Sequence, residues 1–109
     1  MSAFNSVIVP WKSSITSKEY KLKVQFKYGD VWQSVYQIGE TLRWGGNDIG
    51  HPRTRRVVVD GCLEGEPAIP DIPEDFEIYI VENKIDRVIP ATGDYNFVDA
   101  DDTFIVLEE

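Results

Sequence analysis

Cysteine and histidine, which supply many catalytic and metal sites, are almost absent from this chain. Its 109 residues include one cysteine, Cys62, and one histidine, His51. A lone cysteine excludes an internal disulfide framework and a cysteine-based zinc site within one chain. No apolar run approaches the roughly 20 residues that span a bilayer, and the N-terminal residues lack the pattern of a signal peptide. We therefore expect a cytoplasmic protein with no membrane segment, no metal and no cofactor.

Positive charge is scarce in the second half of the sequence. Residues 61–109 hold 14 acidic residues against Lys84 and Arg87, whereas residues 1–28 carry a net charge of +4. The segment between them is neutral, and the whole chain has a formal charge of −8. A field of this sign repels nucleic-acid phosphates and attracts basic proteins. The layout favours a basic protein partner over nucleic acid, and solubility is the simpler alternative.

Helical periodicity is also missing, because no window sustains a period of 3.6 residues. The dominant period is two, and it is clearest over residues 21–28, where every second residue from Leu22 to Tyr28 is apolar. The same reading predicts strands over residues 32–38, 41–44, 55–60, 76–82, 85–89 and 103–107. About seven short, mostly antiparallel strands predict one all-β domain over residues 1–109, either a small sandwich or a partly open barrel.

The acids of the second half are the candidate partner-binding residues. We expect them to form an exposed surface that steers a basic partner, while packed and aromatic contacts set the lifetime of the complex. The candidate residues are Glu74, Asp75, Glu77, Asp94, Asp99, Asp101 and Asp102. The spacing that follows Asp94 does not meet the calcium-loop pattern, so we expect a solvated turn there.

Three aromatic residues suggest a different class of function. Trp32, Tyr36 and Trp44 could line a small-ligand or carbohydrate site, since aromatic side chains with a few polar groups are typical of such pockets. The competing interpretation places the same rings in the hydrophobic core. The sequence leaves both interpretations open.

Catalysis is the third alternative, through Cys62 as nucleophile and His51 as base. Neither residue stands in a catalytic signature, and Cys62 follows a valine-rich strand, where a small buried side chain is expected. The glycine-rich stretch 45–50 lacks the Lys-Ser/Thr pair of a phosphate-binding loop. We therefore expect a protein that is not an enzyme.

Residues 25–50, QFKYGDVWQSVYQIGETLRWGGNDIG, resemble a β block of small uncharacterised bacterial proteins in which flanking cysteine pairs suggest a zinc ribbon. Structural zinc needs four thiolate or imidazole ligands, and only Cys62 remains here. The resemblance thus implies a degenerate zinc-ribbon-like structural protein that is held together by packing alone. Small acidic bacterial proteins also resemble the immunity partners of polymorphic toxins. That similarity implies our leading hypothesis, a non-enzymatic module that occludes a basic toxin or nuclease.

Overall fold

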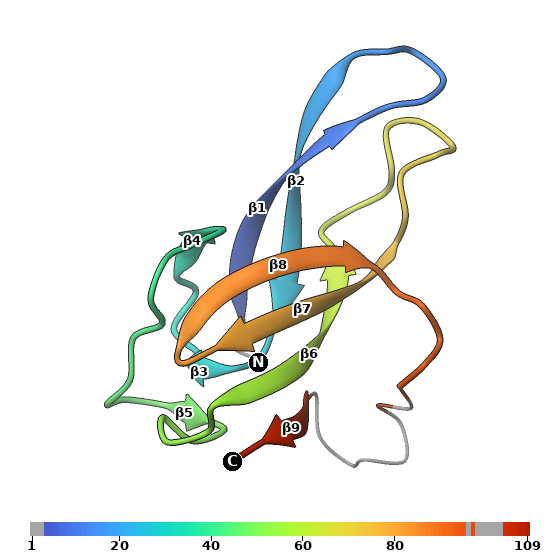
Figure 1. Cartoon of the computed structure of the whole chain (residues 1–109). Coiled ribbons are helices and arrows are strands. Elements are labelled where there is room, and N and C mark those ends of the chain that lie inside the picture. The colour runs from blue at the N-terminus through green and yellow to red at the C-terminus, as the bar shows by residue number, and fades with distance from the viewer. Residues whose placement is uncertain (1–3, 96, 98–103) are drawn as a thin grey trace.

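The computed structural model describes residues 4–95, 97 and 104–109, and the regular elements within them are all β-strands. Six strands form a main sheet in the order β4-β1-β2-β6-β7-β8, and β9 pairs with β6 off this path (Figure 1). These strands are β1 (Asn5–Lys12), β2 (Glu19–Phe26), β4 (Val35–Gln37), β6 (Arg56–Leu63), β7 (Asp75–Val81), β8 (Lys84–Pro90) and β9 (Phe104–Glu108). Two short strands, β3 (Gly29–Asp30) and β5 (Asp48–Ile49), pair separately. The prediction of an all-β domain is confirmed, and of the two architectures predicted, a small sandwich or a partly open barrel, the sheet forms the partly open barrel.

The alternation over residues 21–28 places one face of β2 in the core, as the sequence predicts. Leu22, Val24 and Phe26 are each exposed by 6% or less, and Tyr28, which follows the strand, is also buried. Successive side chains of a strand point to opposite faces, so this pattern commits one face of β2 to the interior. The neighbouring strands supply the rest of the core, including Val7, Val9, Val57, Val59, Phe76, Ile78 and Ile80.

The chain that follows β4 connects the two edges of the main sheet. β4 pairs in parallel with β1 at one edge. A few residues later, Gly39 N donates to Ile85 O at 2.7 Å and Ile85 N donates to Glu40 O at 3.0 Å. Leu42 N then donates to Asn83 O at 2.7 Å. These bonds satisfy backbone groups at the edge formed by β8 and keep the sheet curled.

Along one of its sides, β6 changes partner. Residues 61–63 pair with β2, whereas residues 56–59 pair with β9. Gly61 permits the close approach of β2, because a Cβ there would lie only 2.9 Å from Val24 Cγ1. Beyond this point Tyr28 reaches Phe104 of β9, with the two ring centroids 5.1 Å apart in an edge-to-face arrangement. We call the place where β2 and β9 diverge the β6 fork.

Several predicted elements need correction. Strand β1 was not predicted from the sequence, because its first residues, Asn5 and Ser6, are polar yet buried and so conceal the apolar pattern. Of the strand predicted over residues 32–38 only β4 forms, since Gln33 has a positive φ of 54° that breaks extended structure. The strand predicted over residues 41–44 is reduced to a single bridge between Thr41 and Lys84.

Asn5 is a buried polar side chain that fixes the loop after β2 to β1. It is 0% exposed, and its Nδ2 donates to Tyr28 O at 3.0 Å and to Asp30 O at 3.1 Å. Its Oδ1 accepts from Ser34 N at 3.1 Å. One side chain therefore pairs three backbone groups in or near the interior, of which Asp30 O also accepts from Trp32 N at 3.0 Å.

Replacing Asn5 with alanine is expected to lower the free energy of unfolding by about 2–4 kcal/mol, because it leaves buried backbone groups unpaired and opens a small cavity. Urea unfolding followed by tryptophan fluorescence measures this loss. The matched control is Asn47→Ala, at an exposed position, where we expect a change within about 0.5 kcal/mol. Equal losses in the two variants would contradict the anchoring role.

Candidate functional site

Three exposed acids gather on the outer face of β6 and β7. Asp60 and Asp75 project from these two strands, with Cys62 as the cross-strand partner of Asp75. Glu74 immediately precedes β7 and is also exposed. The alternation of β6 turns Val59 and Gly61 inward and therefore directs Asp60 and Cys62 outward. We call Asp60, Glu74 and Asp75 the acidic patch.

Burial and, after it, crowded negative charge set the titration behaviour of this region. Burial and the nearby charge of Asp75 raise the pKa of Asp60 above its usual value. Burial raises the pKa of the Cys62 thiol, and Asp75, Asp60 and Glu74 raise it further. Like charges that disfavour one another in this way are stabilised when a cation arrives. The patch is thus electrostatically suited to a positive group.

Glu77 lies on the same face of β7 as Asp75 but is not part of any exposed surface, which corrects the prediction. Its exposed fraction is 1%. The carboxylate accepts hydrogen bonds from Tyr79 Oη at 2.9 Å, Thr92 N at 2.8 Å and Thr92 Oγ1 at 2.7 Å. The Arg87 guanidinium covers the Tyr79 ring at 4.2 Å. Glu77 therefore anchors the chain after β8 to the sheet.

These contacts set the protonation states of Glu77 and Tyr79. Burial raises the pKa of Glu77, but the bonds from Thr92 and Tyr79 and the charge of Arg87 outweigh it, so the pKa lies below its usual value of 4.5. Burial, followed by the hydrogen bond to Glu77, raises the pKa of Tyr79 well above its usual range. Glu77 is thus held as a carboxylate and Tyr79 as a neutral donor.

The remaining predicted acids fall into two groups. Asp94 is exposed, and its backbone N donates to Thr92 Oγ1 at 3.1 Å. Asp99, Asp101 and Asp102 lie outside the described residues. Within the described ranges, no group of three His, Cys, Asp or Glu side chains is arranged to hold a metal ion.

The three candidate aromatic residues do not line one site. Trp32 is 74% exposed, whereas Tyr36 is 1% exposed and packs in the core against Phe26. Trp44 is half-buried and meets the Tyr28 ring edge-to-face at 5.4 Å. Trp32 is therefore a surface residue, whereas Tyr36 and Trp44 pack against the core. The alternation of apolar residues could not distinguish them, because these residues lie in or near irregular loops.

Cys62 and His51 do not form a catalytic pair. Cys62 lies six residues along β6 from Arg56, about 20 Å at strand spacing, and His51 belongs to the loop before that strand. Cys62 is exposed rather than buried as expected, and its raised pKa is opposite to that of an activated thiol.

Backbone amides of the glycine-rich loop over residues 45–50 are hydrogen-bonded to carboxylates of the same chain. Gly45 N and Gly46 N donate to the Asp48 carboxylate at 3.0 and 3.3 Å, and Asn47 N donates to Asp30 at 2.8 Å. The amides that could cradle a phosphate are bonded to these carboxylates instead.

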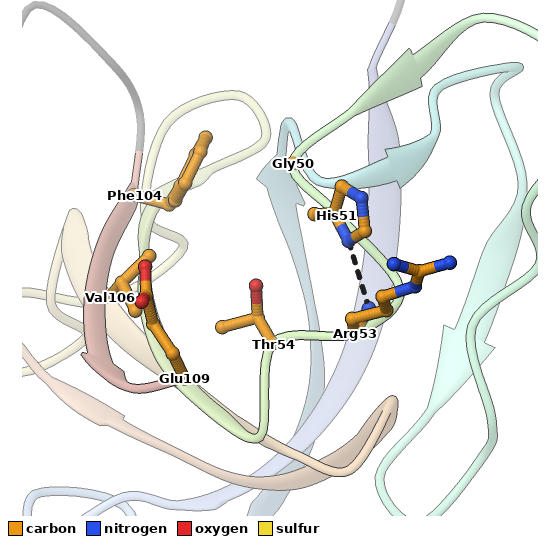
Figure 2. Close-up of a pocket in the computed structure, with 7 residues that line it drawn as sticks. All are labelled: Gly50, His51, Arg53, Thr54, Phe104, Val106 and Glu109. Carbon is orange, nitrogen blue, oxygen red and sulfur yellow. Dashed lines mark hydrogen bonds between the residues drawn. The ribbon is translucent and has the colours of Figure 1, made fainter.

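A pocket that the sequence did not indicate opens beside the β6 fork, with a volume of about 620 Å³. One wall is the loop over residues 50–54, and the other carries Phe104, Val106 and Glu109 at the end of the chain (Figure 2). Its two walls are 50 residues apart in the sequence, and only the pairing of β9 with β6 brings them together.

Comparisons with protein-family models, curated proteins and solved structures return no match. Of the residues that the structure describes, none forms a helix long and apolar enough to cross a membrane. Because no known protein matches, the function of this chain has to be inferred from its own surfaces.

Stability should fall in acid in a way that depends on Glu77. The unfolded chain binds a proton at Glu77 at a higher pH than the folded protein, so the contribution is present above about pH 4.5 and is lost as the pH falls through the lower folded value. Glu77→Gln should cost about 2 kcal/mol at neutral pH. It should also flatten the decline in unfolding free energy below pH 4.5.

Urea unfolding at a series of pH values measures both effects. The pKa of Asp71 is also lowered, because hydrogen bonds from Ser14 and Ser13 outweigh burial, so Asp71→Asn is run in parallel to separate its share. Glu66→Gln, at an exposed loop position, is the control. An unchanged pH profile in Glu77→Gln would show that the anchor contributes nothing to acid sensitivity.

Proposed function

We propose that this chain is a non-enzymatic, cytoplasmic binding module whose acidic patch docks a basic protein, in the manner of an immunity or inhibitor protein that occludes a toxin or nuclease. The observation that carries the proposal is the placement of Asp60 and Asp75 on one exposed face of the paired strands β6 and β7, where burial and then the charge of Asp75 raise the pKa of Asp60. Lysine or arginine side chains of a partner would relieve that repulsion on contact.

Two of the three acids of the patch lie on paired strands, so the backbone positions that carry these two charges are fixed before a partner arrives. Asp60 and Asp75 belong to neighbouring strands whose pairing runs from Arg56 to Cys62 without a shift in register. Preorganised charges lose little conformational freedom on binding, and they speed encounter with an oppositely charged surface. Such a patch favours fast, salt-sensitive association.

The proline-rich loop over residues 64–73 lies at one edge of the acidic patch. Leu63 N donates to Glu74 O at 2.8 Å, which closes the loop at its base beside the patch. The Asp71 carboxylate accepts from Ser13 Oγ at 3.1 Å and from Ser14 N at 2.9 Å, tying the loop to the turn between β1 and β2. In Figure 1 the two tips extend in the same direction. A partner at the patch would meet this loop as a fixed edge.

Trp32, by contrast, belongs to another part of the surface. It precedes β4 at the edge of the main sheet, and β1 and β2 lie between β4 and β6 in the strand order. We therefore centre the proposed contact on the acidic patch and the loop beside it rather than on the exposed tryptophan.

The test compares affinity capture from a native lysate by the wild type and by the variant Asp60→Asn/Glu74→Gln/Asp75→Asn. The wild type should retain a basic protein at about 50 mM salt and lose most of it at about 500 mM, because salt screens exposed charges. With that partner purified, neutralising the patch should slow association about tenfold, as measured by surface plasmon resonance.

The matched control removes the same number of charges elsewhere, at the exposed residues Glu19, Glu82 and Asp86. It should leave association within about twofold of the wild type, because charges far from the contact are screened. Capture of a partner that is not basic, or equal effects of the two triple variants, would refute the proposed docking surface.

A further inference from the structure

The loop that forms one wall of the pocket beside the β6 fork is held by contacts with Tyr28 and by its own hydrogen bonds. Gly50 has a φ of +85°, and a Cβ there would overlap the Tyr28 ring, so only glycine lets the loop lie against that ring. His51 O accepts from Tyr28 Oη at 3.4 Å and from Thr54 N at 3.2 Å. The loop is therefore fixed in shape without a ligand, as most small-molecule sites are.

The loop wall offers hydrogen-bond donors. Arg53 N donates to His51 Nδ1 at 3.1 Å, which makes Nδ1 the acceptor and leaves the proton of the neutral imidazole on Nε2. Figure 2 shows the His51 ring standing between Phe104 and the Arg53 side chain. Both His51 and Arg53 are exposed. Both residues line the pocket, and an imidazole N–H and a guanidinium are each suited to a carboxylate.

The opposite wall is apolar. Phe104 packs edge-to-face on Tyr28 and is half-buried, and Val106 is 39% exposed. Figure 2 shows both side chains on β9, across the pocket from His51. Apolar surface left open inside a concave site gains free energy when a ligand covers it.

We propose that this pocket binds a small amphipathic carboxylate, with the acid group on Arg53 and His51 and an aromatic or aliphatic body against Phe104 and Val106. A volume of about 620 Å³ falls within the range of small-ligand pockets. Glu109 lines the wall that carries Val106, where its negative charge disfavours a second acid group and so sets the orientation of the ligand.

Three probes of one shape and different charge test the proposal: 3-phenylpropionate, 3-phenylpropanol and 3-phenylpropylamine. Titrations of the isotope-labelled protein are followed by amide chemical shifts. The carboxylate should bind about tenfold more tightly than the alcohol, the amine should bind most weakly, and the shifts should cluster at residues 50–54 and 104–109.

Two variants with opposite expected effects make the test independent of folding. Arg53→Gln should weaken carboxylate binding about tenfold, and Glu109→Gln should tighten it about twofold by removing a repulsive charge. Arg56→Gln, an exposed arginine outside this pocket, is the control and should change nothing. Tighter binding of the amine, weakening in Glu109→Gln, or shifts spread away from the two walls would each overturn the proposal.

Discussion

The change of partner along β6 is the constraint on which the rest of the molecule depends. On one side, β6 pairs with β7 from Arg56 to Cys62. On its other side, β6 pairs with β2 at one end and with β9 at the other. Gly61 makes this possible, because a Cβ there would lie only 2.9 Å from Val24 Cγ1 of β2 and 3.1 Å from Ile78 Cδ1 of β7. Tyr28 then fills the gap between β2 and β9 through its contact with Phe104.

Both candidate surfaces follow from that arrangement and lie on opposite faces of it. Phe104 pairs with Val59 and Val106 with Val57, so the pocket wall shares the inward-facing side of β6. Asp60 is the next residue along β6 after Val59 and points the other way. The pocket is lined by β9 and the loop over residues 50–54, whereas the acidic patch lies on and beside β6 and β7, so a charge change in the patch replaces no residue of the pocket.

The sequence predicts the parts of this structure where local pattern and tertiary environment agree. The alternation over residues 21–28 identified a strand with the correct inward face, and the valine run before Asp60 identified a further strand. β1 was missed because its buried Asn5 is explained by distant backbone partners at Tyr28, Asp30 and Ser34, which no local window contains. The pocket was missed for the same reason, as its walls meet only through long-range pairing.

Glu77 and Asp75 show why composition alone cannot define a charged surface. The two acids are two residues apart on one face of β7, and the sequence gives no reason to treat them differently. The chain after β8 brings Thr92 over one of them, so Glu77 is satisfied internally while Asp75 stays exposed beside Asp60. Burying a carboxylate is tolerated only because each of its bonds is charge-assisted. Among the acids of the second half that the structure describes, Glu77 therefore holds the fold, whereas Asp75 remains at the surface.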